Sequence, residues 1–187
     1  MENLDYNTQK RLKKNLIEAL KIVVNIIGQK KYENIGGGPI TIDIFDIPKN
    51  CYGRCKTYRS KNYSVISINR HLLNYDDKII IEVLIHEILH TLKDTRGHNK
   101  KWQYYANKIN ENTEYKVVTR GNIEGVDLGY RYKLMCSHCG LIYGFFRMTK
   151  LWENDFKSGL IRCTKCKKRD VSILDTKKNT ILYKNSE

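Results

Sequence analysis

Two histidines four residues apart in an apolar stretch constrain this chain more than any other feature. The segment DDKIIIEVLIHEILHTLK is apolar on most faces, which predicts a largely buried helix with Asn74 as its N-cap. Because positions four apart lie on one face of a helix, the imidazoles of His86 and His90 can both point at one ion. Buried polar side chains need partners, and one metal ion would satisfy both histidines and the neighbouring Glu87 together.

The letters HEILH fit the pattern H-E-x-x-H, in which two histidines bind zinc and the glutamate acts as a general base. Glu87 lies about 60° around the helix from His90, so its carboxylate can stand beside the ion without being a ligand. A catalytic zinc needs three protein ligands and one open position. We therefore predict peptide hydrolysis by Glu87-assisted attack of zinc-bound water, with Glu87 passing the proton to the leaving amine. The alternative is a chance motif whose histidines are purely structural.

The third zinc ligand must come from beyond this helix, and His98 is the best candidate. The glycine before it lets the chain reverse and return the imidazole from the start of the next helix. Lys93 and Arg96 stand where metzincins require glycine and histidine, which excludes that pattern. A glutamate from a later helix, Glu111 or Glu114, is the competing arrangement.

Four of the six cysteines form two C-x-x-C pairs, CSHC and CTKC. Four thiolates make a closed tetrahedral zinc site, which leaves no position for water and therefore serves folding and not catalysis. A β-hairpin through LIYGFFRMTKLW could fill the 23-residue gap between the pairs. The alternatives are His138 in place of one cysteine, or two disulfides in a compartment that is not reducing. The predicted ligands of this structural zinc are Cys136, Cys139, Cys163 and Cys166.

The remaining two cysteines, Cys51 and Cys55, lie in a probable strand next to a Tyr-Gly-Arg run. Small buried hydrophobic side chains are the simplest interpretation of both, in preference to redox centres.

Periodicity along the chain predicts the elements around these motifs. Apolar residues at three- and four-residue steps indicate an amphipathic helix after Thr8 that ends at Gly28. The runs ITIDIFDI, GRCKTY and YSVISIN predict a small three-stranded antiparallel sheet. Helical spacing resumes over residues 98–110. After Asn112 the sequence turns polar and glycine-containing, as in a linker.

At 187 residues, the chain is long enough for about one domain and a small appendage. We predict an α+β fold with a metalloprotease domain over residues 1–115, a linker over 116–129 and a zinc-ribbon β module over 130–187. The protease domain would contain the N-terminal helix, the small sheet, the HExxH helix and the helix that follows it.

The chain is strongly basic, with 34 Lys and Arg against 20 Asp and Glu and a formal charge of +14. This balance favours a polyanionic partner such as DNA, although a well-solvated lysine-rich surface is the alternative. Residues 120–187 carry 14 of the cations and seven of the acids, interleaved with aromatic residues that could stack on bases. The predicted nucleic-acid-binding residues are Arg131, Lys133, Arg147, Lys150, Arg162, Lys165, Lys167, Lys168 and Arg169.

No apolar run approaches the roughly 20 residues that span a bilayer, and the N-terminus does not resemble a signal peptide. We expect a cytoplasmic monomer, associated with the nucleoid in a bacterial host, that acts on protein substrates without a membrane.

The motifs and their order resemble the SprT-like zinc metallopeptidases, which include the Spartan proteases that degrade proteins crosslinked to DNA. HEILHTLKDTRGHNKKW is similar to that family's HExxH helix with its following Gly-His and downstream aromatic residue, and YGRCKTYRSKNYSVISINRHLL resembles the stretch just upstream. YKLMCSHCG with RCTKC resembles the zinc-ribbon tail of the bacterial branch. The likeness covers roughly residues 10–170.

This resemblance implies a zincin-like fold and two zinc ions, one catalytic and one structural. It makes His86, His90 and His98 similar to the family's zinc ligands, and Glu87 similar to its acid/base residue. It also implies a DNA-stimulated protease of DNA-bound or DNA-crosslinked proteins. Two alternatives remain: a non-catalytic zinc-ribbon protein that regulates by binding nucleic acid, and a protease of one specific regulator.

Overall fold

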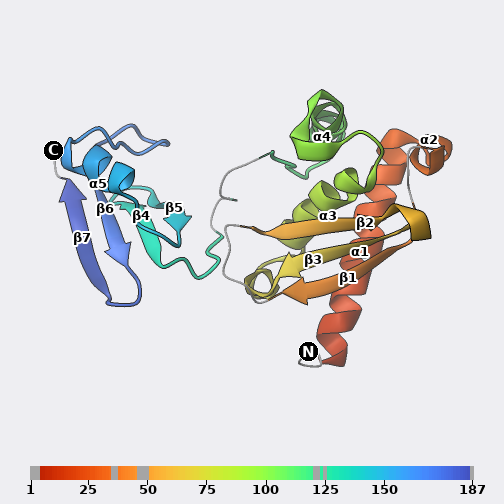
Figure 1. Ribbon diagram of the computed structural model, residues 1–187, viewed down its shortest axis with the longest axis horizontal. Coiled ribbons are helices and arrows are strands. Elements are labelled where there is room, and N and C mark those ends of the chain that lie inside the picture. Colours follow the sequence, from red (N-terminus) through yellow and green to blue (C-terminus); the bar gives the residue numbers. More distant parts are fainter. Residues whose placement is uncertain (1–4, 35–37, 46–50, 120–122, 124–125, 186–187) are drawn as a thin grey trace. The chain divides into compact units, whose positions relative to one another are not determined.

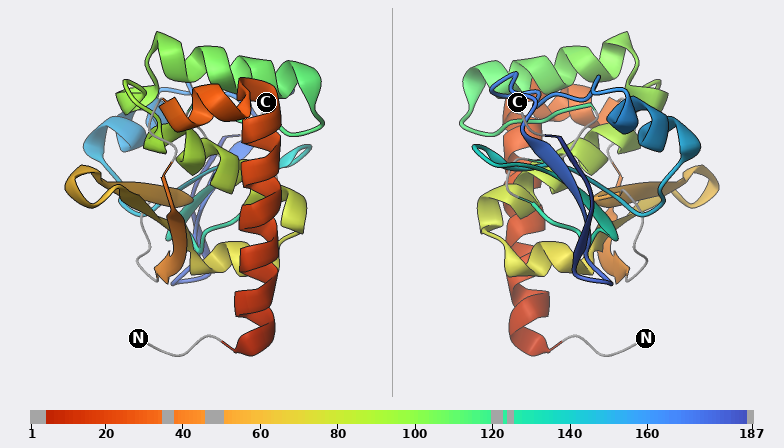
Figure 2. Two further views of the ribbon diagram at one scale, coloured as in Figure 1. Left: turned by 90° about the vertical axis from the view of Figure 1, so that its right-hand side faces the viewer. Right: turned by 90° about the vertical axis from the view of Figure 1, so that its left-hand side faces the viewer.

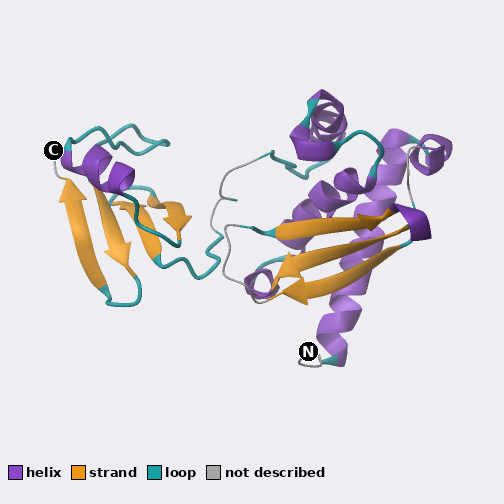
Figure 3. Cartoon of the chain, viewed as in Figure 1, coloured by secondary structure: helices purple, strands orange, loops and turns teal. Residues whose placement is uncertain are grey.

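The computed structural model describes residues 5–34, 38–45, 51–119, 123 and 126–185. It divides into two compact units, which are taken separately below. Unit 1 is Met1–Ile47 with Cys51–Gly121, and unit 2 is Pro48–Asn50 with Asn122–Glu187. Both units combine helix with a small β-sheet (Figure 3), so the predicted α+β class is confirmed.

Unit 1 contains four helices and three strands within its described residues, together with three short 3-10 turns at Arg59–Lys61, Arg70–Asn74 and Arg96–His98. No helix in the described part of the chain has both the length and the apolar character needed to cross a membrane. The helices and strands are α1 (Tyr6–Ile27), α2 (Gln29–Asn34), β1 (Ile40–Phe45), β2 (Gly53–Tyr58), β3 (Tyr63–Asn69), α3 (Asp77–Thr91) and α4 (Lys100–Asn112).

Helix α1 is the amphipathic helix that the sequence predicts. It starts earlier than predicted, because Asp5 is the N-cap and its carboxylate accepts a hydrogen bond from the Thr8 N–H at 3.0 Å. It ends as expected at Gly28, whose φ of 91° few other residues adopt without strain. Its buried face consists of Leu12, Asn15, Leu16, Ala19, Val23 and Ile27.

The three-stranded sheet has the order β1-β3-β2. β2 and β3 form the predicted antiparallel hairpin, but β1 pairs with β3 in parallel, so the all-antiparallel prediction was wrong. The most apolar strand, β3, takes the centre, where Ile66 and Ile68 are fully buried. Since β2 is antiparallel to β3 and β1 is parallel to it, the two edge strands run in opposite directions.

Helices α1 and α3 cover one face of this sheet (Figure 1). Helix α3 begins after Asp76, two residues later than the predicted cap at Asn74. Arg11 joins α1 to the start of α3, because its Nε lies 2.7 Å from Oδ1 of Asp77. Its two terminal nitrogens donate to the carbonyls of Leu73 and Tyr75. Figure 2 shows α4 near the C-terminal end of α1, which it contacts.

Unit 2 is built on a four-stranded antiparallel sheet with the order β5-β4-β6-β7. The hairpin predicted between the cysteine pairs was wrong in its second half, where the chain forms helix α5. Thr149 caps this helix, and the four-residue spacing of Trp152 and Phe156 places both rings against the sheet. The elements are β4 (Tyr132–Cys136), β5 (Gly140–Phe145), α5 (Lys150–Lys157), β6 (Val171–Asp175) and β7 (Thr180–Asn185).

Candidate metal centre

Three imidazoles converge in unit 1. His86 and His90 lie one turn apart on α3, and Nε2 of His98 lies 2.9 Å from Nε2 of His86 and 3.1 Å from Nε2 of His90. His98 returns to α3 because two successive residues, Gly97 and His98 itself, have left-handed φ angles of 65° and 59°. The structure therefore brings the three histidines together at a distance that suits one shared cation.

The competing glutamates lie elsewhere. Neither Glu111 nor Glu114 belongs to the histidine cluster among the described residues. Glu114 instead forms an exposed ion pair with Lys78 at 3.2 Å.

Backbone carbonyls fix the orientation of two of the imidazoles. Nδ1 of His86 lies 2.9 Å from the carbonyl oxygen of Val118, and Nδ1 of His90 lies 3.2 Å from that of Thr95. A carbonyl only accepts, so each Nδ1 carries the hydrogen and each Nε2 presents a bare lone pair. His98 can donate a hydrogen from Nε2 to only one of these two lone pairs. A cation at the centre satisfies all three nitrogens, so the donor set fits a metal ion.

The surroundings keep these rings neutral and rigid. Burial, followed by the proximity of His90 and His98, lowers the pKa of His86 to about 3, and burial followed by His98 lowers that of His90. Neutral imidazole is the form that binds zinc. The fully buried ring of Trp102 lies 4.7 to 5.7 Å from all three imidazoles, centroid to centroid, and packs them in place.

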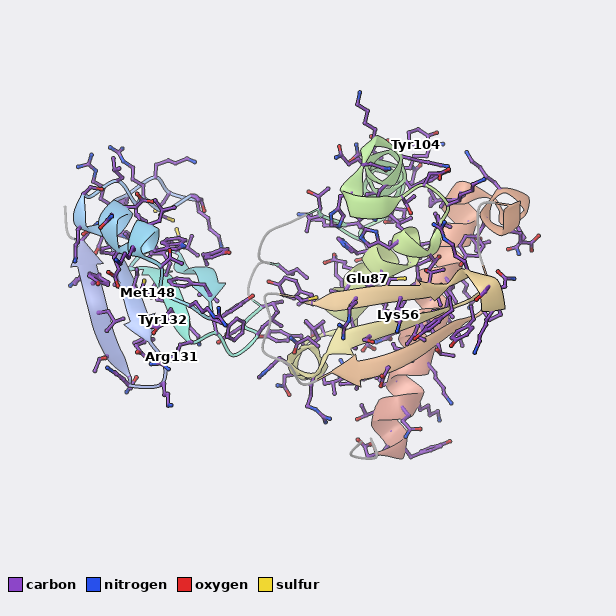
Figure 4. The ribbon with its side chains drawn as sticks, in the orientation of Figure 1. Lys56, Glu87, Tyr104, Arg131, Tyr132 and Met148 are labelled. Carbon is purple, nitrogen blue, oxygen red and sulfur yellow. The ribbon has the colours of Figure 1, made fainter. Side chains whose placement is uncertain are left out.

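Glu87 is the buried carboxyl of this site, with only 5% of its surface exposed. Burial raises its pKa to about 8, against the opposing effect of the Cys55 backbone N–H, which donates to it. Figure 4 shows Glu87 on α3 beside β2. The strand approaches so closely that a Cβ at Gly53 would lie 2.8 Å from both Cγ and Oε1 of Glu87.

Sequence reasoning missed the part that Gly53 plays. The available signal was a glycine at the start of a strand pattern, which often marks a close backbone approach. Here the missing side chain makes room for the carboxyl group that the sequence analysis assigns to catalysis.

Sequence reasoning also missed the part that residues 116–118 play, because they fall in the predicted linker. The Lys116 N–H donates to Oε1 of Glu82 at 2.9 Å, and the Val117 N–H donates to Oδ1 of Asn110 at 2.7 Å. These two bonds hold the segment against α3 and α4, and they place the Val118 carbonyl on His86. Nothing local in the sequence marks this role.

The model of the SprT-like family matches residues 30–121, a range that contains all of β2, α3 and α4 and every residue of the histidine site. These residues belong to the SprT-like family. A comparison with curated proteins found no match for the chain. The SprT-like residues thus place a buried glutamate on the helix that carries two of the three converging imidazoles, and nearly all of unit 2 lies outside the matched range.

Beyond the SprT-like residues, unit 2 gathers the four predicted cysteines. The sulfur atoms of Cys136, Cys139, Cys163 and Cys166 all lie within 4.8 Å of one another. None of the six cysteines of the chain is in a disulfide, which rules out the two-disulfide alternative in this structure. Four sulfurs at this separation are compatible with one zinc ion.

The chemistry of one of these sulfurs supports a metal site. Burial works to raise the pKa of Cys163, but backbone N–H groups of Cys166 and Lys165 donate to its sulfur, and the resulting pKa is about 6. Hydrogen bonding to the neighbouring Cys166 sulfur, followed by burial, raises the pKa of Cys139 to about 12, so without a metal the cluster favours one thiolate among thiols. A thiolate at neutral pH is the form that binds zinc. His138 lies outside the sulfur cluster, with its Nε2 3.8 Å from a carboxylate oxygen of Asp170.

The predicted cationic residues of unit 2 fall into two groups. Arg131 forms a two-pronged pair with the buried Asp175 at 2.8 and 2.9 Å and also lies over the Tyr132 ring, as Figure 4 shows. Lys133 pairs with Asp127. Arg131 and Lys133 therefore already form ion pairs within unit 2, which is a structural role. The other seven are exposed: Arg147, Lys150, Arg162, Lys165, Lys167, Lys168 and Arg169.

The two remaining cysteines flank Gly53 within the SprT-like residues. The Cys51 thiol donates to the Gly53 carbonyl at 2.7 Å. Burial raises the pKa of Cys55 to about 11, so it stays a thiol at neutral pH. Both cysteines are only partly buried, so the prediction of buried side chains was wrong, but the raised pKa of Cys55 is the opposite of the lowered pKa that a redox centre requires.

Proposed function

We propose that the chain is a zinc-dependent endopeptidase with a zincin-like protease unit. One zinc would be bound by His86, His90 and His98, and a second, structural zinc by the four cysteines of unit 2. The observation that carries the proposal is the convergence of three Nε2 atoms, two of them oriented by backbone carbonyls, on the helix that also carries the buried Glu87.

His86, His90 and His98 would hold the zinc ion, which would supply Lewis-acid chemistry toward water and the peptide carbonyl. The protein's own contribution centres on Glu87, which accepts a proton from the attacking water and passes it to the leaving amine. Burial favours the protonated form of this carboxyl, and the charge of a nearby zinc ion would favour the carboxylate that accepts the proton. Gly53 and the Cys55 N–H hold this carboxyl in place.

Strand β2 is the edge of the sheet nearest Glu87, so it supports a proposal for where the substrate lies. An extended peptide added beside β2 would be held by main-chain hydrogen bonds. Such binding demands little sequence specificity, as expected of a protease that acts on many proteins.

The basic surface of unit 2 supports DNA as the partner that brings substrates to the protease. Its seven exposed cations suit sequence-independent contact with phosphates. We extend the proposal to DNA-stimulated cleavage of DNA-bound or DNA-crosslinked proteins.

The test uses the zinc-loaded chain, a basic DNA-binding protein as substrate, and reactions with and without DNA. We expect cleavage that DNA stimulates. Glu87→Gln should lower the cleavage rate by about 10²- to 10⁴-fold, because it removes the proton acceptor, while elemental analysis still finds two zinc ions. Glu111→Gln, on the exposed side of α4, is the matched control and should cleave normally.

Undiminished cleavage by Glu87→Gln would remove this residue from the chemistry. DNA binding with no cleavage by the wild-type chain would favour the non-catalytic alternative. Equal rates with and without DNA would leave a protease but overturn the DNA proposal.

A further inference from the structure

Unit 2 carries a groove whose apolar lining has no part in the zinc chemistry or in the proposed DNA contact, although two of the seven exposed cations, Arg162 and Lys165, also line it. The groove has a volume of about 750 Å³ and lies between β4, β5, α5, the second cysteine pair and two residues before β4, Ile123 and Val126. Ligand-binding clefts of proteins fall in this size range. Its apolar lining includes Leu141, Ile142, Tyr143, Leu151, Trp152 and Ile161.

An irregularity in β5 creates this lining. Leu134 pairs with Tyr143 and the next residue of β4 pairs with Leu141, so Ile142 is an extra, unpaired residue in the strand. A bulge of this kind redirects side chains and disrupts regular strand pairing at the edge of a sheet. Three consecutive side chains of β5 therefore reach the groove, and an occupant would be recognised through side chains more than through added strand hydrogen bonds.

One wall of the groove is unusually exposed. Leu151, in the first turn of α5, has 68% of its surface exposed although it lines the groove. The neighbouring Trp152 is already stacked, with its ring 5.0 Å from Phe145 at 9° and 5.8 Å from Tyr143 at 16°. These contacts cover one face of the indole and hold its ring in place. Most of the other apolar residues that line the groove are aliphatic.

The rim indicates the charge of the occupant. Arg162 and Lys165 stand on one side as exposed cations, and Asp155 lines the groove from α5. Aliphatic walls with two cations and one acid favour an apolar peptide with acidic residues. A nucleic acid would prefer free aromatic faces and would meet the Asp155 carboxylate with its phosphates.

We propose that this groove binds an unfolded protein segment rich in leucine and isoleucine and flanked by acidic residues. Aliphatic side chains enter beside Leu151 and Ile161, and the acidic residues pair with Arg162 and Lys165. Binding here is separate from hydrolysis and does not depend on the proposed protease activity.

The test measures binding of a fluorescein-labelled 16-residue peptide that contains leucines and glutamates, followed by anisotropy. The protein is the full zinc-loaded chain with Glu87→Gln, so that the peptide is not cut. Leu151→Ser should weaken binding at least fivefold, because an exposed apolar contact is lost. Leu160→Ser is the matched control, since this leucine is 72% exposed and lies outside the groove lining. It should leave binding unchanged.

The second measurement tests the predicted charge of the occupant. Arg162→Glu should weaken binding of the glutamate peptide and strengthen binding of the same peptide with lysines. The proposal is overturned if the peptide does not bind, or if both leucine variants weaken binding equally. It is also overturned if Leu151→Ser weakens binding of a single-stranded oligonucleotide as strongly as it weakens binding of the peptide, since nucleic acid would then be the occupant. If Leu151→Ser abolishes self-association of the chain, a second copy is the occupant and the proposal is likewise overturned. Loss of peptide binding would leave zinc content and protein cleavage untouched, so the two proposals fail separately.

Discussion

Thr95 serves the histidine site through two different groups. Its backbone carbonyl orients His90, and its fully buried hydroxyl lies 2.7 Å from the carbonyl oxygens of both Leu89 and Leu92 at the end of α3. Thr95→Val should cost about 1–2 kcal/mol of unfolding free energy, because a buried carbonyl loses its donor. It should also weaken zinc binding about tenfold. The hydroxyl bonds hold the Thr95 backbone in place, so without them the Thr95 carbonyl no longer fixes the orientation of His90. Chelator competition measures the affinity and denaturant titration the stability.

A second threonine separates these two effects. The Thr113 hydroxyl donates to the Ile109 carbonyl at the end of α4, which is the same kind of bond away from the histidines. Thr113→Val should lower stability and leave zinc affinity unchanged. If both variants lose zinc affinity equally, the effect comes from general destabilisation and not from the orientation of His90.

At the scale of elements, the approach of β2 to α3 determines where the Glu87 carboxyl lies. Gly53→Ala would add a Cβ 2.8 Å from Glu87 and 2.9 Å from Cγ1 of Val83, so the glutamate must move. We expect kcat for cleavage to fall about 10- to 100-fold, since small displacements of a catalytic group are costly. KM and the zinc content should stay near wild type.

The control for this change is another crowded glycine. A Cβ at Gly38 would lie 2.6 Å from the Asn62 carbonyl oxygen, so Gly38→Ala strains the same unit without contacting Glu87. It should lower the unfolding midpoint and leave kcat unchanged. A normal kcat in Gly53→Ala would show that the carboxyl tolerates displacement.

Elements with a local signal could be predicted from the sequence. The spacing of His86 and His90 requires a helix, and Gly97 explains the return of His98, so the three nitrogens could be expected to meet before any coordinates existed. The predictions that were wrong or missing concern contacts between residues far apart in the sequence. β1 pairs in parallel with β3, which is not the next strand in the sequence, and no local pattern encodes that pairing. The Val118 carbonyl reaches His86 from 32 residues away along the chain.

Helix α5 was not predicted although the sequence contains local signals for a helix there. Thr149 is a suitable N-cap, and Trp152 and Phe156 have helical spacing. The predicted hairpin accounts only for the length of the gap between the cysteine pairs, whereas the cap and the helical spacing correctly indicate a helix.

At the scale of the whole molecule, each of the two units holds one group of side chains that could bind a metal ion. Unit 2 is small and has a limited core, so a structural zinc should supply much of its folding free energy. The double variant Cys139→Ser with Cys166→Ser should bind one zinc ion in place of two. Limited proteolysis should then degrade Asn122–Glu187 and leave a resistant fragment close to Met1–Gly121.

The same double cysteine variant also separates DNA stimulation, proposed for unit 2, from peptide cleavage, proposed for unit 1. Without a folded unit 2, cleavage in the absence of DNA should persist near the wild-type rate, and stimulation by DNA should disappear. The reciprocal variant, His90→Ala with His98→Ala, should retain one zinc ion in unit 2 and bind DNA without cleaving protein. The contrary outcome is that loss of the cysteine zinc also removes the histidine zinc, or makes unit 1 sensitive to the protease added for limited proteolysis. The two units would then fold cooperatively. The metal centres would then be coupled through the fold.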